Sequence, residues 1–217
     1  MAAGRVSVNG EVTTELGTRV VAGRDVVAVD GVVVEIQAKK WIAFHKPVGV
    51  LTTRSDPHGG RTIYDVLPDE FSALRYVGRL DRPTEGLLLL TNDGDAANGL
   101  LHPSREVERE YSVVVAGVMD EAAVNRLRRG VDLDDGPARP KSVRVVERGE
   151  LDTTLALVLT EGRKREVRRM LLAVNVGVQR LVRTRFGRVR LERLASGEWR
   201  KLSAFEIESL LDLSSLK

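Results

Sequence analysis

The sequence contains no cysteine. This absence excludes disulfide bridges, thiolate metal sites and cysteine nucleophiles. The three histidines, His45, His58 and His102, are scattered without the spacing of metal ligands, so we expect no bound metal. No apolar run approaches the roughly 20 residues that a membrane-spanning helix needs. The amino terminus also lacks the basic-then-apolar pattern of a signal peptide, so we expect a cytoplasmic protein with no membrane partner.

The composition is that of a globular protein, with 42% hydrophobic and 30% charged residues in a chain of 217. This length allows one substantial domain and a small appendage. The net charge is +3, but ten basic side chains face only two acidic ones between Glu161 and Arg190, a local charge of +8. Such a stretch, rich in arginine, indicates a docking face for a polyanionic partner. The alternative is an arginine-rich surface that contacts only solvent.

The hydrophobic pattern predicts a small β-rich piece followed by a larger unit of the α+β class. Residues 1–36 indicate short strands, with turn signals at Asn9-Gly10 and Asp30-Gly31. Farther along, apolar and β-branched runs predict strands, and capped or periodic segments predict helices. The expected strands are 41–44, 87–90, 111–115, 143–146 and 153–160, and the expected helices are 62–67, 95–101, 120–129, 163–174 and 203–213.

The segment 163–174 has the clearest helical period. Val167, Met170, Leu171 and Val174 lie at positions i, i+3, i+4 and i+7, which form one apolar stripe. Arg168 flanks this stripe at the boundary of the core, where a partly buried ion pair is expected. Lys164 also flanks the stripe, while Arg165 and Arg169 lie on the far face and are suited to phosphate contacts. The alternative is an ordinary amphipathic surface helix.

Five segments in a fixed order carry a resemblance to a known family. They are Lys46–Val50 (KPVGV), Gly78–Thr91 (GRLDRPTEGLLLLT), His102–Ser104 (HPS) with Glu108–Tyr111 (EREY), Glu161–Met170 (EGRKREVRRM), and Leu181–Arg183 (LVR) with Phe186-Gly187. Together they resemble the bacterial ribosomal RNA pseudouridine synthases of the RsuA/RluB branch, over roughly residues 40–205. Residues 4–31 resemble the second half of a small S4-like RNA-binding domain whose first two helices are absent here.

The resemblance implies a fold and a domain plan. We expect an incomplete S4-like RNA-binding domain over residues 1–36. Residues 37–217 are expected to form an α+β catalytic domain with a mixed or antiparallel sheet. The reaction changes no oxidation state and needs no cofactor.

The resemblance also implies the roles of three catalytic residues. Asp81 is expected to be the catalytic carboxylate, attacking C1′, assisting loss of the base to a glycal-type intermediate, or attacking C6 of uracil. Tyr111 is expected to lie against the target uracil and to help handle the proton at C5. Arg168 is expected to pair with Asp81 and keep it ionised. Without the surrounding motifs, Asp81 would be interpreted as a loop residue that caps a turn.

The expected RNA contacts rest on the same motifs. Arg79 is expected to hold the flipped nucleotide or fill its vacancy. The other expected contacts are basic residues and one threonine: Lys46, Thr84, Arg163, Lys164, Arg165 and Arg169.

The segment His102–Tyr111 resembles the B-type enzymes that act on the large ribosomal subunit more than the enzymes that act on the small one. We therefore expect a monomer that acts on 23S rRNA, with 16S rRNA as the alternative target. A second alternative is a non-catalytic RNA-binding protein of ribosome assembly. A glycoside hydrolase is disfavoured because the motif supplies no second catalytic carboxylate.

Overall fold

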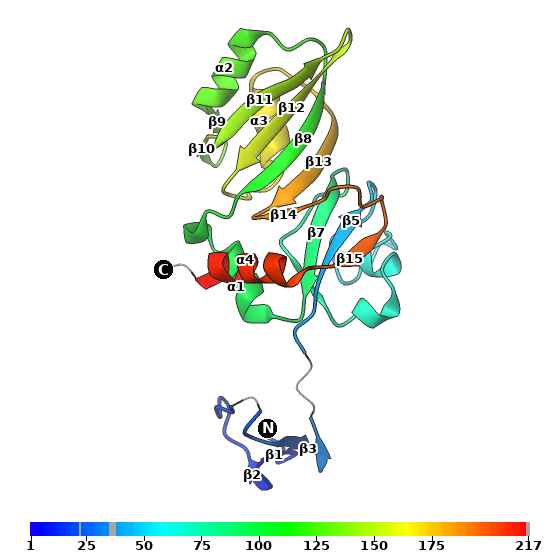
Figure 1. The fold of residues 1–217 in the computed structure, drawn as a ribbon, viewed down its shortest axis with the longest axis vertical. Coiled ribbons are helices and arrows are strands. Elements are labelled where there is room, and N and C mark those ends of the chain that lie inside the picture. The colour runs from blue at the N-terminus through cyan, green and yellow to red at the C-terminus, as the bar shows by residue number, and fades with distance from the viewer. Residues whose placement is uncertain (22, 35–37, 216–217) are drawn as a thin grey trace. The chain divides into compact units, whose positions relative to one another are not determined.

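The computed structural model describes residues 1–21, 23–34 and 38–215. It divides the chain into two compact units, Met1–Lys39 and Lys40–Lys217 (Figure 1). The boundary expected between residues 36 and 37 falls outside the described residues. Within the three described ranges, no helix is both long and apolar enough to cross a membrane.

The amino-terminal unit is a four-stranded antiparallel sheet of order β2-β1-β3-β4. Its strands are β1 (Val6–Val8), β2 (Glu11–Thr13), β3 (Val27–Val29) and β4 (Val32–Val33). Both predicted hairpins are present, because Asn9-Gly10 and Asp30-Gly31 all adopt positive φ angles, as a two-residue turn of this kind requires. Ala28 is buried but Val12, Val32 and Val33 are exposed, so the core of this unit is small.

The larger unit is built on one sheet of order β11-β12-β8-β13-β7-β5-β15. Strand β6 (Arg75–Val77) pairs with β7, and β14 (Val189–Arg190) pairs with β13. Only the β13–β7 pairing is parallel; the other strand pairs of the described sheet are antiparallel. The predicted α+β fold with a mixed sheet is therefore confirmed. The other strands are β5 (Trp41–Lys46), β7 (Glu85–Thr91), β8 (Arg109–Ala116), β11 (Ser142–Arg148), β12 (Asp152–Leu159), β13 (Val178–Phe186) and β15 (Trp199–Lys201).

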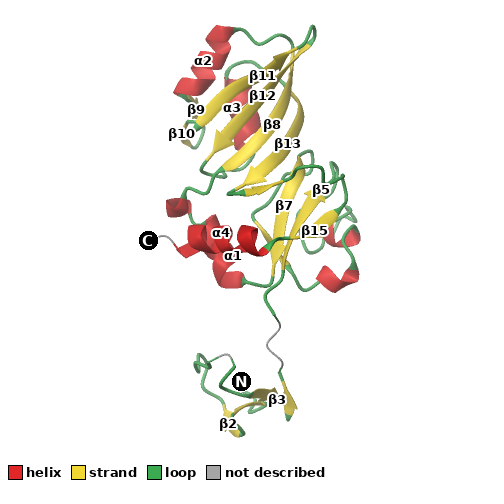
Figure 2. Cartoon of the chain, viewed as in Figure 1, coloured by secondary structure: helices red, strands yellow, loops and turns green. Residues whose placement is uncertain are grey.

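Helices lie beside both halves of this sheet (Figure 2). Helices α2 (Glu121–Arg129) and α3 (Glu166–Ala173) accompany β11, β12, β8 and β13, and α1 (Gly94–Leu101) packs on α4 (Ala204–Ser215). Short 3₁₀ turns occupy Ile63–Asp65, Asp69–Phe71 and Pro103–Arg105, and β9 (Val131–Leu133) and β10 (Gly136–Ala138) form a small hairpin.

Side-chain caps explain where three of the helices begin. The Asp93 carboxylate accepts a hydrogen bond from the Ala96 amide, and that of Asp120 accepts one from Ala123. Ser203 and Glu206 cap α4 reciprocally. These starts match the capping residues that the sequence provides.

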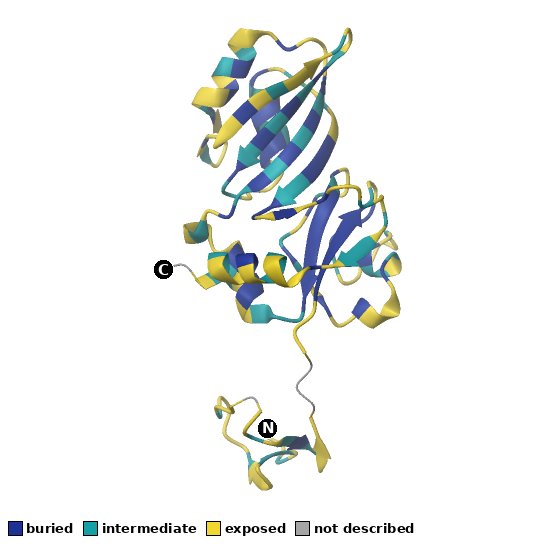
Figure 3. Cartoon of the chain, viewed as in Figure 1, coloured by how far each residue is buried: buried dark blue, intermediate teal, exposed yellow. Residues whose placement is uncertain are grey.

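The core has two clusters, one containing α3 and the other containing α1 and α4. Strands β8 and β12 alternate between buried and half-buried residues, whereas β7 is buried almost throughout (Figure 3). Tyr111, Val113 and Val115 of β8 share the face that packs on Met170 and Leu171 of α3. The continuous apolar run Leu87–Leu90 is therefore a central strand buried on both faces, as predicted.

Three segments differ from the sequence predictions. Helix α3 begins at Glu166 and not at residue 163, because Arg165 adopts a left-handed conformation with φ of 52°. The expected helix 62–67 is only the 3₁₀ turn Ile63–Asp65. Strand β13 was not predicted, because its three arginines at positions 180, 183 and 185 mask its apolar residues.

Candidate active site

A cleft of about 1040 Å³ opens on the larger unit where loops meet the floor formed by β8 and β13. One wall is the loop 78–84 between β6 and β7, and another is the segment 159–167 that leads into α3. The structure therefore brings together residues that are far apart in the sequence. The expected site residues that line the cleft are Asp81, Tyr111, Arg79, Thr84, Arg163, Lys164 and Arg165.

The loop that carries Asp81 is held by hydrogen bonds on both sides of the residue. The Thr52 hydroxyl donates to the Leu80 carbonyl at 2.9 Å, and the Thr84 amide donates to the Asp81 carbonyl at 3.0 Å. Leu80 is buried, and Thr84 is buried with a hydroxyl that has no hydrogen-bond partner within the described residues. The backbone of Asp81 is thus fixed while its half-buried side chain faces the cleft.

Two cations lie close to the Asp81 carboxylate. Burial lowers the pKa of Lys46 to about 8, and the charges of Asp81 and Glu85 oppose that shift. Burial also lowers the pKa of Arg168, as does the neighbouring Arg165, and again Asp81 opposes the shift. Both cations therefore interact electrostatically with the Asp81 carboxylate.

The structure corrects two expectations about these cations. Lys46 was expected to contact phosphate, but its side chain is fully buried and its Nζ donates to the Pro47 carbonyl at 2.8 Å. Arg168 was expected to form an ion pair with Asp81. Instead, its Nη2 donates to the Pro83 carbonyl at 2.9 Å, and no ion pair joins it to Asp81 among the described residues. Arg168 therefore ties α3 to the catalytic loop through the backbone.

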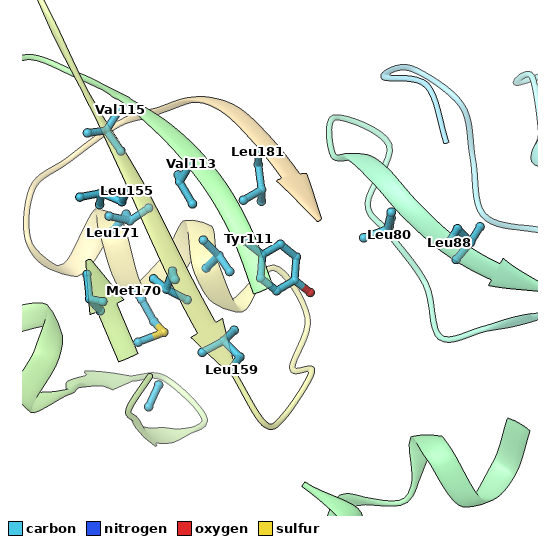
Figure 4. Packing of buried hydrophobic residues seen from close by; sticks show 14 of the residues in the cluster. Leu80, Leu88, Tyr111, Val113, Val115, Leu155, Leu159, Met170, Leu171 and Leu181 are labelled. Carbon is cyan, nitrogen blue, oxygen red and sulfur yellow. The ribbon is translucent and has the colours of Figure 1, made fainter. Parts of the chain in front are cut away.

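Tyr111 lies near the start of β8, on the cleft floor. Only 9% of its surface is exposed, and its ring packs in the cluster with Val113, Leu159 and Leu181. Its hydroxyl points away from these aliphatic side chains (Figure 4). Tyr111 is therefore both part of the core and part of the cleft lining.

Three buried ionisable residues that sequence reasoning did not assign also line the cleft: Arg109, Glu166 and Arg183. Burial and the nearby Glu161 raise the pKa of Glu166 to about 7, although the Arg163 amide donates to its Oε2 at 3.1 Å. Arg109 donates to the carbonyls of Val107 and Thr160. The sequence could have revealed them, because each is a charged residue at a position where the pattern of the strand or helix predicts a buried apolar residue.

The net positive charge of residues 161–190 is partly neutralised in the folded structure, because acidic residues from other segments pair with several of its arginines. Arg169 makes a two-pronged pair with Asp135, and Arg180 makes one with Glu85. The other pairs with acidic residues outside this segment are Arg163–Asp135, Arg185–Glu108 and Arg185–Glu110. These pairs leave fewer free cations in the segment than the count along the sequence suggests. Lys164 and Arg165 stay exposed at the cleft.

The cleft thus offers a carboxylate beside two cations, an aromatic hydroxyl and exposed basic residues at its edge. Within the described ranges, no group of three or more His, Asp or Glu side chains could hold a metal ion. The arrangement suits acid–base or nucleophilic chemistry by Asp81 on a substrate that carries phosphate.

Comparison with known proteins identifies the family. The model of the RNA pseudouridylate synthase family matches residues 40–173. The chain belongs to this family. Ribosomal large subunit pseudouridine synthase B of Vibrio cholerae is 44% identical over 99% of this chain and 69% of its own length. An uncharacterized RNA pseudouridine synthase of Aquifex aeolicus is 40% identical over 99% of this chain and 86% of its own. The predicted family and the predicted enzyme class are confirmed.

Solved structures agree with this assignment. A crystal structure of a pseudouridylate synthase superposes with a TM-score of 0.74 at 28% identity, covering 96% of this chain and 90% of the other. The archaeal box H/ACA sRNP Nop10–Cbf5 complex shows the fold alone, with a TM-score of 0.53 at 17% identity. It covers 73% of this chain and 51% of the other. The pseudouridine synthase fold of this chain is therefore shared well beyond its sequence relatives.

Proposed function

We propose that this pseudouridine synthase isomerises a uridine of 23S ribosomal RNA, with Asp81 as its catalytic carboxylate. Relatives 44% identical over nearly the whole chain are named for the large ribosomal subunit. The observation that carries the role of Asp81 is its place in the cleft, beside Lys46 and Arg168 and with Tyr111 on the floor. We propose 16S rRNA as the alternative target, because the chemistry at the site would be the same.

Asp81 starts the reaction by acting on the nucleotide sugar or base. The bond between N1 and C1′ breaks, the uracil turns, and C5 bonds to C1′. Asp81 is suited to attack C1′, to assist loss of the base, or to attack C6 of uracil, and each route needs an ionised carboxylate. The charges of Lys46 and Arg168 act on the Asp81 carboxylate, so both are positioning residues in this proposal.

The cleft lining supplies the other parts of the reaction. The ring of Tyr111 stacks on the uracil, an interaction of about 1–3 kcal/mol in comparable RNA sites. Its hydroxyl helps to remove the C5 proton. Arg79 and the unpartnered hydroxyl of Thr84 bind the flipped nucleotide, while Lys164 and Arg165 contact its flanking phosphates. Arg163 and Arg169 are held by Glu161 and Asp135, so they act in shaping this edge of the cleft.

Substitution of Asp81 by asparagine tests the catalytic role. Asp81→Asn keeps the size of the side chain but removes its charge, so we expect turnover to fall by at least about 10³-fold while RNA affinity stays within a few fold. Release of tritium from RNA labelled at uridine C5 measures turnover. Asp69→Asn, an exposed aspartate that does not line the cleft, is the matched control. Normal turnover in Asp81→Asn would remove Asp81 from the mechanism.

Mapping of pseudouridine in the rRNA of cells that lack this protein tests the target. Loss of one site in 23S rRNA supports the proposal, loss in 16S rRNA supports the alternative, and no loss in either would contradict both.

We further propose that the enzyme acts as a cytoplasmic monomer, because Asp81, Tyr111 and Arg168 all come from one chain. Light scattering on the purified protein tests the monomer.

A further inference from the structure

Arg183 is a fully buried arginine at the place where the two halves of the sheet meet. It lies on β13, opposite Tyr111 of β8 and beside Gly86 of β7. Only 2% of its surface is exposed, and its Nε donates to the Leu87 carbonyl at 2.8 Å. A β-carbon on Gly86 would collide with the Arg183 carbonyl oxygen. The backbone of Arg183 and the Nε atom of its guanidinium group are therefore held in place.

The charge of Arg183 is not balanced by a neighbouring carboxylate among the described residues, where no ion pair joins it. Its Nη2 is buried there without a hydrogen bond. Its neighbour Arg109 is also a buried cation, and both guanidinium groups lie near the ring of Phe186, at 5.4 and 5.1 Å. Buried charges are usually paired, since removal from water is costly. An unpaired buried charge beside a cleft indicates that negative charge is present near it during the reaction.

The hydroxyl of Tyr111 is the group on which that charge can develop. Tyr111 and Arg183 lie on directly opposite positions of paired strands, so their side chains share the face that forms the cleft floor. Burial lowers the pKa of Arg183, and its interaction with Tyr111 opposes this shift. Both observations place the guanidinium next to the phenol.

We propose that Arg183 is a positioning residue for Tyr111, which orients its oxygen and stabilises the phenolate that accepts the C5 proton. This role rests on the proposed function of Tyr111. A positive charge fixed beforehand beside the oxygen stabilises that phenolate without any rearrangement of the site. Arg183 does not touch the substrate in this proposal.

Removal of the C5 proton is chemically separate from the earlier steps of the reaction. Cleavage of N1–C1′ and formation of C5–C1′ leave C5 with four single bonds, one of them to hydrogen. Tyr111 enters this step as a phenolate that has given its own proton to solvent. Its oxygen accepts the C5 hydrogen as a proton, the bonding electrons restore the C5–C6 double bond, and N1 gains a proton. Only this last step requires the Tyr111 hydroxyl group and Arg183.

RNA that carries 5-fluorouridine at the target position isolates the earlier steps. Fluorine at C5 cannot leave as a proton, so the base is rearranged but its double bond is not restored. Single-turnover rates on uridine RNA and on 5-fluorouridine RNA, measured by nuclease digestion and mass spectrometry, then compare the whole reaction with its first part.

For Arg183→Met we expect the rate on uridine RNA to fall at least about tenfold. The rate on 5-fluorouridine RNA should stay within about threefold of wild type. Tyr111→Phe, the matched variant, should likewise slow the reaction on uridine RNA and leave the rate on 5-fluorouridine RNA nearly unchanged. Arg183→Lys should recover part of the lost rate on uridine RNA, because it restores the positive charge. Equal slowing on both RNAs, or no slowing on either, would overturn the role of Arg183.

The two proposals can fail separately. A Tyr111→Phe enzyme with normal turnover would refute the role of Tyr111, and the role of Arg183 with it. If Tyr111→Phe slows the reaction on uridine RNA alone but Arg183→Met does not, only the inference about Arg183 is overturned. Activity on 5-fluorouridine RNA also reports folding of each variant. If Arg183→Met does not fold, Arg183→Gln keeps a donor for the Leu87 carbonyl without the charge and is judged by the same criteria.

Discussion

Lys46 is an amine buried without full compensation, since its Nζ donates to a single backbone carbonyl while Asp81 and Glu85 act from a distance. A lysine buried at this position costs stability at neutral pH. Its charge lies near Asp81, and in the proposed mechanism it positions that carboxylate. In this proposal, function at Lys46 opposes stability.

This cost should depend on pH. Lys46 has a pKa of about 8 in the folded state, below its ordinary value of 10.5. Below pH 8 it is protonated in both states, and the buried charge lowers the free energy of unfolding by about 3 kcal/mol. Between pH 8 and 10.5 the unfolded state holds more protons, so this loss is regained as pH rises. The stability gained by Lys46→Met should therefore shrink over this window.

Urea unfolding at several pH values measures the difference between Lys46→Met and wild type. The exposed residue Lys164 provides the control, since Lys164→Met should show a difference that does not change with pH. A constant difference for Lys46→Met would contradict the lowered pKa.

Gly86 is a second residue whose requirement can be tested. Its φ of 109° is unfavourable for other residues, and a β-carbon would collide with the backbone of Arg183. Gly86→Ala should therefore lower the free energy of unfolding by about 2 kcal/mol or more. Gly94→Ala, at the open first turn of α1, should change it by less than about 1 kcal/mol. Chemical denaturation compares the two, and equal effects would contradict a tight β7–β13 junction.

The segment that leads into α3 is the element that presents cations to the substrate. Lys164 and Arg165 are exposed at the cleft, and Arg165 holds the left-handed turn from which α3 begins. Arg163 and Arg169 on either side are bound by acidic residues. Only part of the basic motif is therefore available to phosphate.

RNA affinity as a function of salt concentration can test this division. Each phosphate contact on single-stranded RNA contributes about −0.7 to the slope of log affinity against log salt. Lys164→Ala and Arg165→Ala should each make the slope shallower by about that amount. Arg169→Ala should leave it unchanged, because Asp135 already neutralises this arginine. A shallower slope for Arg169→Ala would show that the pair opens on binding.

At the scale of the whole molecule, the residues of the proposed active site and both core clusters belong to the unit Lys40–Lys217. The Thr91 hydroxyl and the Asn92 side chain bind the backbone of Lys40, so the start of this unit is anchored in its own sheet. The small unit Met1–Lys39 has a minor core, and we propose that it is related to S4-like RNA-binding domains and adds RNA contacts.

A fragment of residues 40–217 should therefore fold and keep its chemistry. We expect its thermal unfolding to be cooperative, with a midpoint within a few degrees of the full chain. Its single-turnover rate at saturating RNA should match that of the full chain, and any loss should fall on RNA affinity. An unfolded fragment, or a slower chemical step, would contradict the independence of the larger unit.

The sequence alone determined much of the local structure and the motifs that identify the family. Turn residues, caps and apolar runs predicted the hairpins at Asn9 and Asp30, the buried strand Leu87–Leu90 and the start of α2, because these depend on neighbours along the chain. The motif around Asp81 identified the family for the same reason.

Tertiary structure decided what depends on residues far apart. It buried Lys46 and Arg183, bound Arg168 to Pro83, and paired Arg169 and Arg180 with distant acids. It also made a strand of β13, whose arginines are accommodated by partners from β7 and β8. Charge counted along the sequence could not reveal this, because the energy of a charge depends on its burial and on its neighbours in space.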